Sequence, residues 1–347
     1  MRKIATILLI LSLFRVAAQE AQFSQYYSAS LYLNPGFNGI YTQNSVHINH
    51  KRQLQSGDLI NELTQVSFIF PILTQNSKGI AEPIGGAGVM AFQEKSEFRG
   101  IYERSSVFLN YAHNLKFGLL NSYLISIGVQ AGYEIRKLNF SSLNWGSQYN
   151  PFFGPDDTLP IPVTEFDSQI QNVVINGGIM YYYNPERNYL LHKYSGFVGI
   201  SATNLNRPNT SFSVAEEYTD PILLKYNGGI EFKFRKFFVT PSLLFLYLNK
   251  NYQFNAGINT AWVPNADQIR AKGAQLLFGT WYRYRDSFIF MGGIKVSQLT
   301  VRASYDMNSQ LFVPERDIDL IQNSVEISIH YNLSKSTNFK KAANPLF

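Results

Sequence analysis

The chain has 347 residues and a formal net charge of +6, with 45% hydrophobic, 15% aromatic and only 16% charged residues. An average soluble domain contains about 25% charged residues, so we do not expect a water-exposed surface of ordinary charge density. The absence of cysteine excludes a disulfide scaffold, thiolate metal sites and a cysteine nucleophile. After the first 20 residues, no apolar run approaches the roughly 18 to 20 residues of a membrane-spanning helix, which excludes a helical membrane protein.

The first segment, Met1–Ala18, has the pattern of a secretory signal peptide. Arg2-Lys3 forms a basic start, Ile4–Phe14 an apolar centre, and small residues follow. We expect cleavage between Ala18 and Gln19, because the apolar centre is too short to anchor the chain across roughly 30 Å of hydrocarbon. Removing the three basic residues of the signal lowers the formal net charge from +6 to +3. Charge therefore gives no indication of a nucleic-acid partner.

Beyond the signal, apolar and polar residues alternate in several runs. The clearest are Tyr123–Arg136, Ile230–Arg235, Leu299–Asp306 and Val325–Leu333. In the last run every odd position is apolar, and the even positions hold Glu326, Ser328, His330 and Asn332. Successive side chains of a strand point to opposite faces, so each run has one apolar and one polar face. Charges opposite a uniformly apolar face need a wet or paired interior, which predicts an all-β, transmembrane antiparallel β-barrel.

Applied to the whole chain, the alternation predicts about fourteen strands, an even number as in bacterial single-chain barrels. Their expected starts are near Ser45, Leu63, Gly85, Ile101, Tyr123, Asn172, Tyr194, Leu223, Phe237, Gln253, Ala274, Ser287, Gln298 and Val325. Every strand edge must be paired in lipid, so the sheet must close. We therefore expect a signal peptide (1–18), an N-terminal periplasmic plug or cap segment (19–44), an outer-membrane β-barrel (45–333) and a periplasmic C-terminal tail (334–347).

The lengths of the connections test this strand count independently. The three longest, Lys137–Gln171, Leu205–Ile222 and Met307–Ser324, each follow an odd-numbered strand and therefore share one rim. Such barrels have long loops outside and short periplasmic turns, so this rim is expected to face the cell exterior. Two connections on the opposite rim, Pro71–Ile84 and Pro264–Gly273, are longer than expected, which indicates a misplaced strand boundary.

A secreted, soluble β-sandwich is the main alternative fold, because its strands also alternate against a core. The 22 tyrosines and 27 phenylalanines favour the barrel, since aromatic girdles mark both membrane interfaces. Candidate girdle residues are Tyr181, Tyr182, Tyr183, Trp281, Tyr282, Tyr284, Phe288 and Phe290.

The polar face of the strands carries several charges that should point into the lumen. These are Glu134, Arg136, Lys233, Arg235, Arg283, Lys295 and Arg302. They would line a water-filled pore with slight anion preference, or they would pair across a filled interior. The sequence leaves both alternatives open.

The segment before the first strand contains two turn signals, Asn34-Pro35-Gly36 and Asn38-Gly39. Pro presets φ, and Gly or Asn accepts positive φ, so the segment should be a compact peptide. It could plug the lumen, line the periplasmic mouth, dock a periplasmic partner or simply cap the barrel end.

Two motifs in this segment, Ala21–Tyr26 and Tyr32–Gly39, resemble the N-terminus of the PorP/SprF family of outer-membrane proteins. The resemblance continues through Lys51-Arg52-Gln53, although Leu54 stands where the family often has tryptophan. Weaker matches follow at Gly196–Ser201, Asn204–Pro208, Ser304–Asp306 and Ser324–Ile327. The resemblance thus spans nearly the whole mature chain.

This resemblance implies an outer-membrane component or partner of the type IX secretion and gliding machinery of Bacteroidetes, and not an enzyme. Such a barrel would link periplasmic secretion proteins to a secreted surface protein or adhesin, with outer-membrane lipid around it. Expected plug or partner-docking residues are Gln22, Phe23, Ser24, Gln25, Tyr26, Asn34, Pro35 and Gly36. A passive or substrate-specific outer-membrane pore is the alternative function.

No motif in the sequence indicates catalysis, a cofactor or a metal. His47 and His50 are three residues apart, which places them on opposite faces of a strand and disfavours a shared zinc site. Gly85–Gly88 lacks the features of a nucleotide loop and indicates close packing instead. Asp156-Asp157 could contribute to a calcium site but fits a solvated loop better. A hydrolase whose serine, histidine and acid meet only in three dimensions is the remaining enzymatic alternative.

Overall fold

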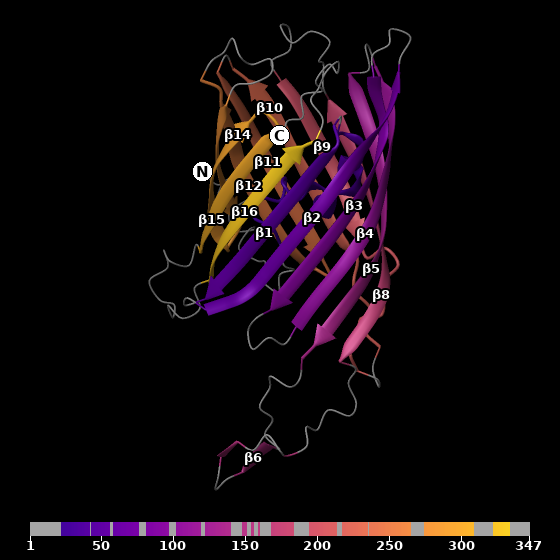
Figure 1. Ribbon diagram of the computed structural model, residues 1–347, viewed down its shortest axis with the longest axis vertical. Coiled ribbons are helices and arrows are strands. Elements are labelled where there is room, and N and C mark those ends of the chain that lie inside the picture. Colours follow the sequence, from indigo (N-terminus) through magenta and orange to yellow (C-terminus); the bar gives the residue numbers. More distant parts are fainter. Residues whose placement is uncertain are drawn as a thin grey trace, which may run out of the picture.

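The computed structural model describes residues 22–41, 43–55, 58–75, 81–96, 102–118, 122–139, 148–150, 154–155, 159, 168–183, 194–213, 217–234, 236–264, 274–308 and 322–333. They form one closed antiparallel barrel of fourteen strands, in which β1 closes the ring against β16 (Figure 1). The barrel strands are β1 (Ser45–Gln55), β2 (Asp58–Gln75), β3 (Ala81–Ser96), β4 (Tyr102–Phe117), β5 (Tyr123–Leu138), β8 (Gln169–Tyr183), β9 (Tyr194–Thr203), β10 (Leu223–Lys233), β11 (Phe237–Leu248), β12 (Asn251–Trp262), β13 (Gln275–Arg283), β14 (Ser287–Val296), β15 (Leu299–Asn308) and β16 (Gln322–Asn332). The predicted fold class is confirmed.

The observed strand starts agree with the predicted ones to within five residues. The expected long connection Pro71–Ile84 is wrong, because β2 continues through Pro71 to Gln75 and β3 begins at Ala81. Pairing of β2 with β1 ends at Ile69, so Pro71 lies where only β3 is paired with the strand, and a register shift follows between Ile72 and Leu73. Proline therefore marks an irregularity inside the strand and not its end.

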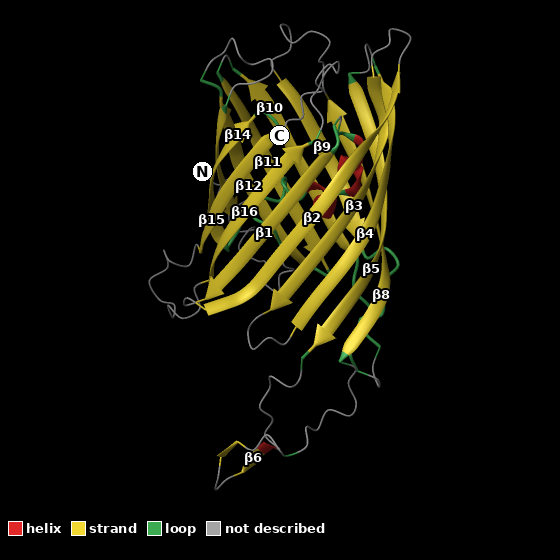
Figure 2. Cartoon of the chain, viewed as in Figure 1, coloured by secondary structure: helices red, strands yellow, loops and turns green. Residues whose placement is uncertain are grey.

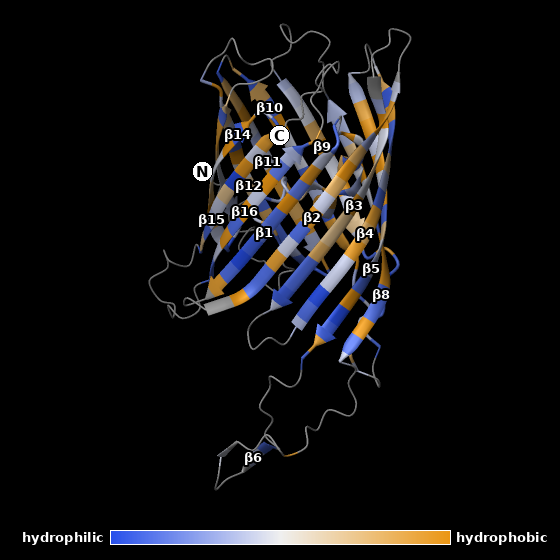
Figure 3. Cartoon of the chain, in the orientation of Figure 1, coloured by the Kyte–Doolittle hydropathy of each residue, from blue (hydrophilic) through white to orange (hydrophobic). Residues whose placement is uncertain are grey.

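The two faces of the barrel wall differ as the alternation requires. On β16, Ile327 is 47% exposed on the outer face, whereas the neighbouring Glu326 is 1% exposed and faces the lumen. The same alternation of hydrophobic and hydrophilic residues runs along the other strands in Figure 3. Because apolar side chains face outward on all sides, the barrel presents a surface suited to lipid.

Aromatic side chains gather near both rims of this outer face. Phe117, Tyr123, Tyr181, Tyr183 and Tyr194 form a chain of ring contacts at one rim. Near the other rim, ring contacts join Tyr226 to Phe245 and Tyr252, and Tyr282 to Tyr284 and Phe288. Two expected girdle members are wrong: Tyr182 and Trp281 are buried and point inward, because each lies one residue from an outward aromatic on its strand.

The wall has unequal height. Strands β2 to β8 in the barrel have 15 to 18 residues, whereas β9 to β16 have 9 to 12. We call the rim with the connections after β5, β9 and β15 the long-loop rim; it is at the bottom of Figure 1. The opposite rim, where β1 begins and β16 ends, is the terminal rim. A short hairpin of β6 (Tyr149–Asn150) and β7 (Gly154–Pro155) lies in the β5–β8 connection.

The only regular helical structure inside the barrel in the described ranges lies before β1. Two short pieces, α2 (Ser30–Leu33) and the 3-10 helix η1 (Pro35–Gly39), lie within the lumen (Figure 2). Neither of these helices, nor any other in the described ranges, is long and apolar enough to cross a membrane.

Candidate functional site

The segment Gln22–Tyr41, which we call the plug, occupies the lumen. Every one of its residues is buried except Gln22 and Tyr32, which are half-buried. The plug contacts strands around the circumference: β1, β3, β4, β8, β9, β10, β11, β13, β15 and β16. Because these contacts surround the plug, it fills the cross-section of the barrel at its own level.

The first residues of the plug are held by charged side chains of the wall. The Ser24 N–H donates to Glu326 Oε2 at 2.6 Å, and its hydroxyl donates to Asp306 Oδ2 at 2.5 Å. Lys51 Nζ lies 3.3 Å from the same Asp306 oxygen, and Arg283 lies 3.2 Å from it. We call Lys51, Arg283, Asp306 and Glu326 the ion cluster. Buried charges are costly unless paired, so this cluster and Ser24 stabilise each other.

Gln25 adds a neutral contact beside the ion cluster. Its Nε2 donates to Ser304 Oγ at 3.1 Å, and its Oε1 accepts from Ser328 Oγ at 2.8 Å. Ser304 and Ser328 are inward positions of β15 and β16, which are paired with each other near this point. The carboxamide thus joins the plug to the last two strands of the barrel.

Aromatic residues form the middle of the plug. The Tyr26 hydroxyl donates to Ser242 Oγ at 2.9 Å, and burial raises the pKa of Tyr26 to about 12, so the donor stays protonated. Tyr27 stacks on Trp281 with ring centroids 5.3 Å apart. The Lys225 ammonium donates to the Tyr32 carbonyl at 2.9 Å and lies 4.2 Å from that ring's centroid.

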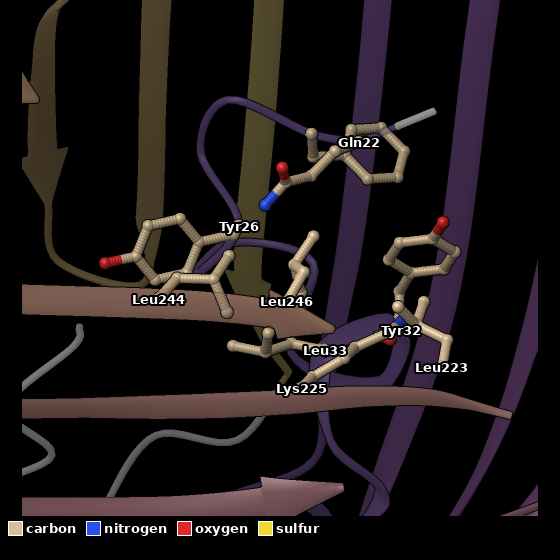
Figure 4. Close-up of a pocket in the computed structure, with 9 residues that line it drawn as sticks. Gln22, Tyr26, Tyr32, Leu33, Leu223, Lys225, Leu244 and Leu246 are labelled. Carbon is tan, nitrogen blue, oxygen red and sulfur yellow. Dashed lines mark hydrogen bonds between the residues drawn. The ribbon is translucent and has the colours of Figure 1, made fainter. Parts of the chain in front are cut away.

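A small pocket lies between the plug and the wall. Figure 4 shows Tyr26, Tyr32 and Leu33 of the plug facing leucines of β10 and β11 across it. Its lining is apolar apart from Gln22 and Lys225. These wall residues lie near the long-loop ends of β10 and β11, so the pocket is on that side of the plug.

The last part of the plug is held without charges. Asn34 Oδ1 accepts from the Gly36 N–H at 2.8 Å and caps η1, while its Nδ2 donates to the carbonyls of Ile179 and Ile200, each at 3.2 Å. Asn38 Nδ2 donates to Asn110 Oδ1 at 2.9 Å. The two carboxamides thus join the plug to β4, β8 and β9 through neutral hydrogen bonds.

Three inward glycines of the wall form the seat for this part of the plug. A Cβ added to Gly86 would lie 2.2 Å from the Asn38 carbonyl oxygen, and one on Gly128 would lie 2.3 Å from the Pro35 carbonyl carbon. One on Gly178 would lie 2.1 Å from Asn34 Oδ1. We call Gly86, Gly128 and Gly178 the glycine seat. The sequence indicates close packing at Gly85–Gly88, but the approaching segment is found only in the structure.

The expected lumen charges lie in several environments. Glu134 is buried and accepts from Arg104 at 2.7 Å and from Arg136 at 2.6 Å, and Arg136 also pairs with Asp220. Lys233 lies 3.7 Å from Glu231. Arg283 belongs to the ion cluster, Arg302 is buried against the plug and Lys295 is half-buried. Arg235, Ala18 and Gln19 lie outside the described residues.

Sequence reasoning missed most of the ion cluster. Lys51, Asp306 and Glu326 fall within matched family motifs, but nothing local assigns them a role. The alternation of apolar and polar residues is the one signal that could have found them, because each is a charged residue on the inward face of its strand. Their partner, Ser24, is 282 residues from Asp306 and 302 from Glu326 in the chain.

His47 and His50 lie on opposite faces of β1, as their spacing predicts. His47 faces inward beside His330, with ring centroids 3.9 Å apart, whereas His50 faces outward and lies 3.3 Å from Glu62. Within the described ranges, no group of three histidine, aspartate or glutamate side chains is placed to hold a metal ion.

Residues 15–331 match the family described as type IX secretion system membrane protein PorP/SprF. The chain belongs to this family. As a PorP/SprF protein with a closed barrel and an apolar outer face, it is a component of the outer membrane. The match includes all of the plug and nearly all of the barrel.

Solved structures of other barrels resemble this PorP/SprF chain in overall fold. They include the CymD monoaromatic hydrocarbon channel (10% identity, 92% of this chain and 95% of that chain covered, TM-score 0.47). A Pseudomonas aeruginosa FadL homologue is also similar, at 8% identity, with 88% of this chain and 94% of that chain covered and a TM-score of 0.43. So is the Pseudomonas putida toluene transporter TodX, at 10% identity, with 87% of this chain and 92% of that chain covered and a TM-score of 0.45. A comparison with curated proteins gave no match.

Proposed function

We propose that this protein is an outer-membrane scaffold of the type IX secretion machinery that links periplasmic secretion proteins to an exported surface protein. The observation that carries the proposal is a lumen filled by the chain's own plug in a member of the PorP/SprF family. A barrel closed in this way is suited to holding partners at its two rims and not to passing solutes. Its role is structural and not enzymatic.

The pairing of the lumen charges supports a scaffold over a passive pore. Glu134 lies between Arg104 and Arg136, and Asp306 lies between Lys51 and Arg283. Charges that neutralise one another do not present a continuous wet surface to a diffusing ion. The exterior contacts would involve residues 137–171, 205–222 and 307–324, and the tail 334–347 would lie in the periplasm.

Affinity capture from detergent-solubilised outer membrane tests the scaffold. The tagged protein should recover periplasmic secretion components, a surface protein or both, identified by mass spectrometry. Recovery of neither, under conditions in which a control outer-membrane complex stays intact, would contradict the proposal. N-terminal sequencing of the purified protein tests the expected cleavage between Ala18 and Gln19.

Planar-bilayer recording tests the alternative function. The purified barrel should be electrically silent if the plug remains seated. Steady single-channel steps from the unaltered protein would favour a pore and contradict the closed scaffold.

A further inference from the structure

The wall has an abrupt step where β8 meets β9. Strand β8 pairs with β5 from Gln169 to Tyr183, but it pairs with β9 only from Gly177 to Tyr183. Its first eight residues, Gln169–Asn176, therefore extend toward the long-loop rim beyond the end of β9. Among the described residues, only Leu205 and Asn206 of the β9–β10 connection bond to the backbone of this stretch on its open side.

Those two residues show which backbone groups face the open side. Leu205 N–H donates to the Ile175 carbonyl at 2.8 Å, and the Ile175 N–H donates to Asn206 Oδ1 at 3.0 Å. Asn206 Nδ2 donates in turn to the Val173 carbonyl at 2.7 Å. The Asn206 carboxamide thus takes the place of a peptide group in the next strand.

Beyond Asn206 the edge has no partner among the residues that the structure describes. In an antiparallel strand, the N–H and C=O groups of one residue point to the same side, and successive residues alternate between the two sides. In β8 the odd-numbered residues point these groups to the open side. The N–H and C=O of Gln171 and the N–H of Val173 therefore point outward from the edge. No residue in the described part of the chain bonds to them.

The sequence of this edge lacks the usual protection against strand addition. Gln169–Ile175 reads QIQNVVI, with no charge, proline or glycine. Natural edge strands are protected by lysines, prolines or bulges, and uncharged segments rich in β-branched residues are the ones that template pairing. The neighbouring strands carry charges at the same rim: Glu94, Lys95, Glu103, Arg104, Arg136 and Lys137.

The end of the edge nearest the rim also lies in water. Gln169 and Gln171 are exposed on the outer face, and Lys137, the β5 partner of Gln169, is exposed beside them. Polar and charged outward residues place the Gln169–Gln171 end of this stretch beyond the apolar belt of the barrel, whereas the outward Val173 and Ile175 belong to that belt. An unpaired row of backbone donors and acceptors in water selects an extended polypeptide over a lipid or an ion.

We propose that the free edge of β8, Gln169–Ile175, binds an extended segment of the exported surface protein by β-strand addition. The identity of this occupant rests on the proposed function, because the edge lies at the rim that carries the long loops. The incoming strand pairs with Gln171 and Val173 and ends at Asn206. An uncharged, β-branched segment matches the side chains that it would meet on both faces.

Proline at position 171 tests the edge specifically. Gln171→Pro removes an N–H that faces the open side and leaves the bonds to β5 in place, whereas Gln171→Ala shortens the same side chain and keeps the N–H. Gln169 is replaced by photoreactive p-benzoylphenylalanine in both variants and in the parent chain, and cells are irradiated. Gln322, exposed at the same rim and paired with β1, is the control position for the photoreactive residue.

We expect a cross-link from position 169 to one extended segment of an exported protein, mapped by mass spectrometry. Gln171→Pro should lower its yield at least tenfold, Gln171→Ala less than twofold, and position 322 should not give it. A cross-link to the chain's own 140–167 connection or to a second copy, no cross-link, or equal yields in the two variants would overturn the inference. Heat-modifiable migration on gels verifies that each variant is folded.

These outcomes separate the inference from the proposed function. If the parent chain captures a surface protein but position 169 does not cross-link to it, the edge inference fails and the scaffold stands. If the parent chain captures neither a surface protein nor a periplasmic component, the proposed function itself fails.

Discussion

The two ends of the plug are held to the wall by opposite chemistry. At the first end, Ser24 bonds to buried charges of β1, β13, β15 and β16. At the other end, Asn34 and Asn38 bond to neutral groups, the plug backbone lies directly against Gly86 and Gly128, and the Asn34 side chain lies against Gly178. The ion cluster depends on charge balance, whereas the glycine seat depends on shape.

This difference determines which substitutions are tolerated at each end. A buried ion cluster fails when one partner is removed, because the remaining charges are left unpaired. A close-packed seat fails when an atom is added, because neither backbone can move aside cheaply. The two ends therefore respond to different kinds of change, and four predictions test this, in order of decreasing effect.

Asp306→Ala should have the largest effect. It leaves Lys51 without the buried carboxylate that it shares with Arg283, and breaking such a pair costs about 3 to 5 kcal/mol. Guanidinium unfolding in detergent micelles, followed by tryptophan fluorescence, measures the free energy of unfolding. Asp306→Asn keeps an acceptor for Ser24 and should cost less. An Asp306→Asn barrel as stable as the parent would show that the charge is not what holds this end.

Gly128→Val should be next. The added side chain meets the Pro35 backbone, and overpacking of this kind costs about 3 kcal/mol when neither side can relax. The variant should also show conductance steps in planar bilayers, because the plug leaves its seat. Gly292→Val is the matched control: no atom lies within 4 Å of its added Cβ, and its stability should change by less than about 0.5 kcal/mol. A silent, fully stable Gly128→Val barrel would refute the shape-dependent seat.

Asn34→Ala should cost about 2 kcal/mol, because it removes the acceptor of the buried Gly36 N–H and the Nδ2 donor to the carbonyls of Ile179 and Ile200. The same unfolding titration measures the loss. Asn209→Ala, at an exposed position of the β9–β10 connection, provides the comparison and should be close to neutral. A loss no greater than that of Asn209→Ala would contradict a holding role for Asn34.

Tyr26→Phe should have the smallest effect, about 1 kcal/mol, because it removes one hydrogen bond and keeps the buried ring. Ser242→Ala removes the acceptor of the same bond. The double variant should lose less than the sum of the two single losses, as for residues in direct contact. Full additivity would show that the hydroxyls do not interact.

The architecture could be predicted from the sequence because the barrel wall is encoded locally. The alternation within Val325–Leu333 needs no distant residue to indicate a lipid face and a lumen face. The same period-two pattern predicts that Glu326 faces inward and Ile327 outward, as the structure shows. A strand boundary is harder to predict at a proline, because proline can end a strand or lie within one, as Pro71 does in β2.

The plug's contacts could not be predicted in the same way. Asn34-Pro35-Gly36 indicates a compact turn, but its neighbours Gly128, Gly178 and Ile200 come from three different strands. Which inward charges meet is set by the registers of β1, β15 and β16 and not by any local pattern. Likewise, the free edge of β8 follows from the difference in length between two adjacent strands.

The path of the plug has a consequence for biogenesis. Gln22 and Ser24 lie beside residues near the long-loop ends of β1, β15 and β16, yet the segment leads into β1 at the terminal rim. Ser24 thus acquires its carboxylate partners, Asp306 and Glu326, only after β15 and β16 are in place. The charged contacts of the plug are therefore among the last to form during folding, because they join residues that are 282 and 302 positions apart in the chain.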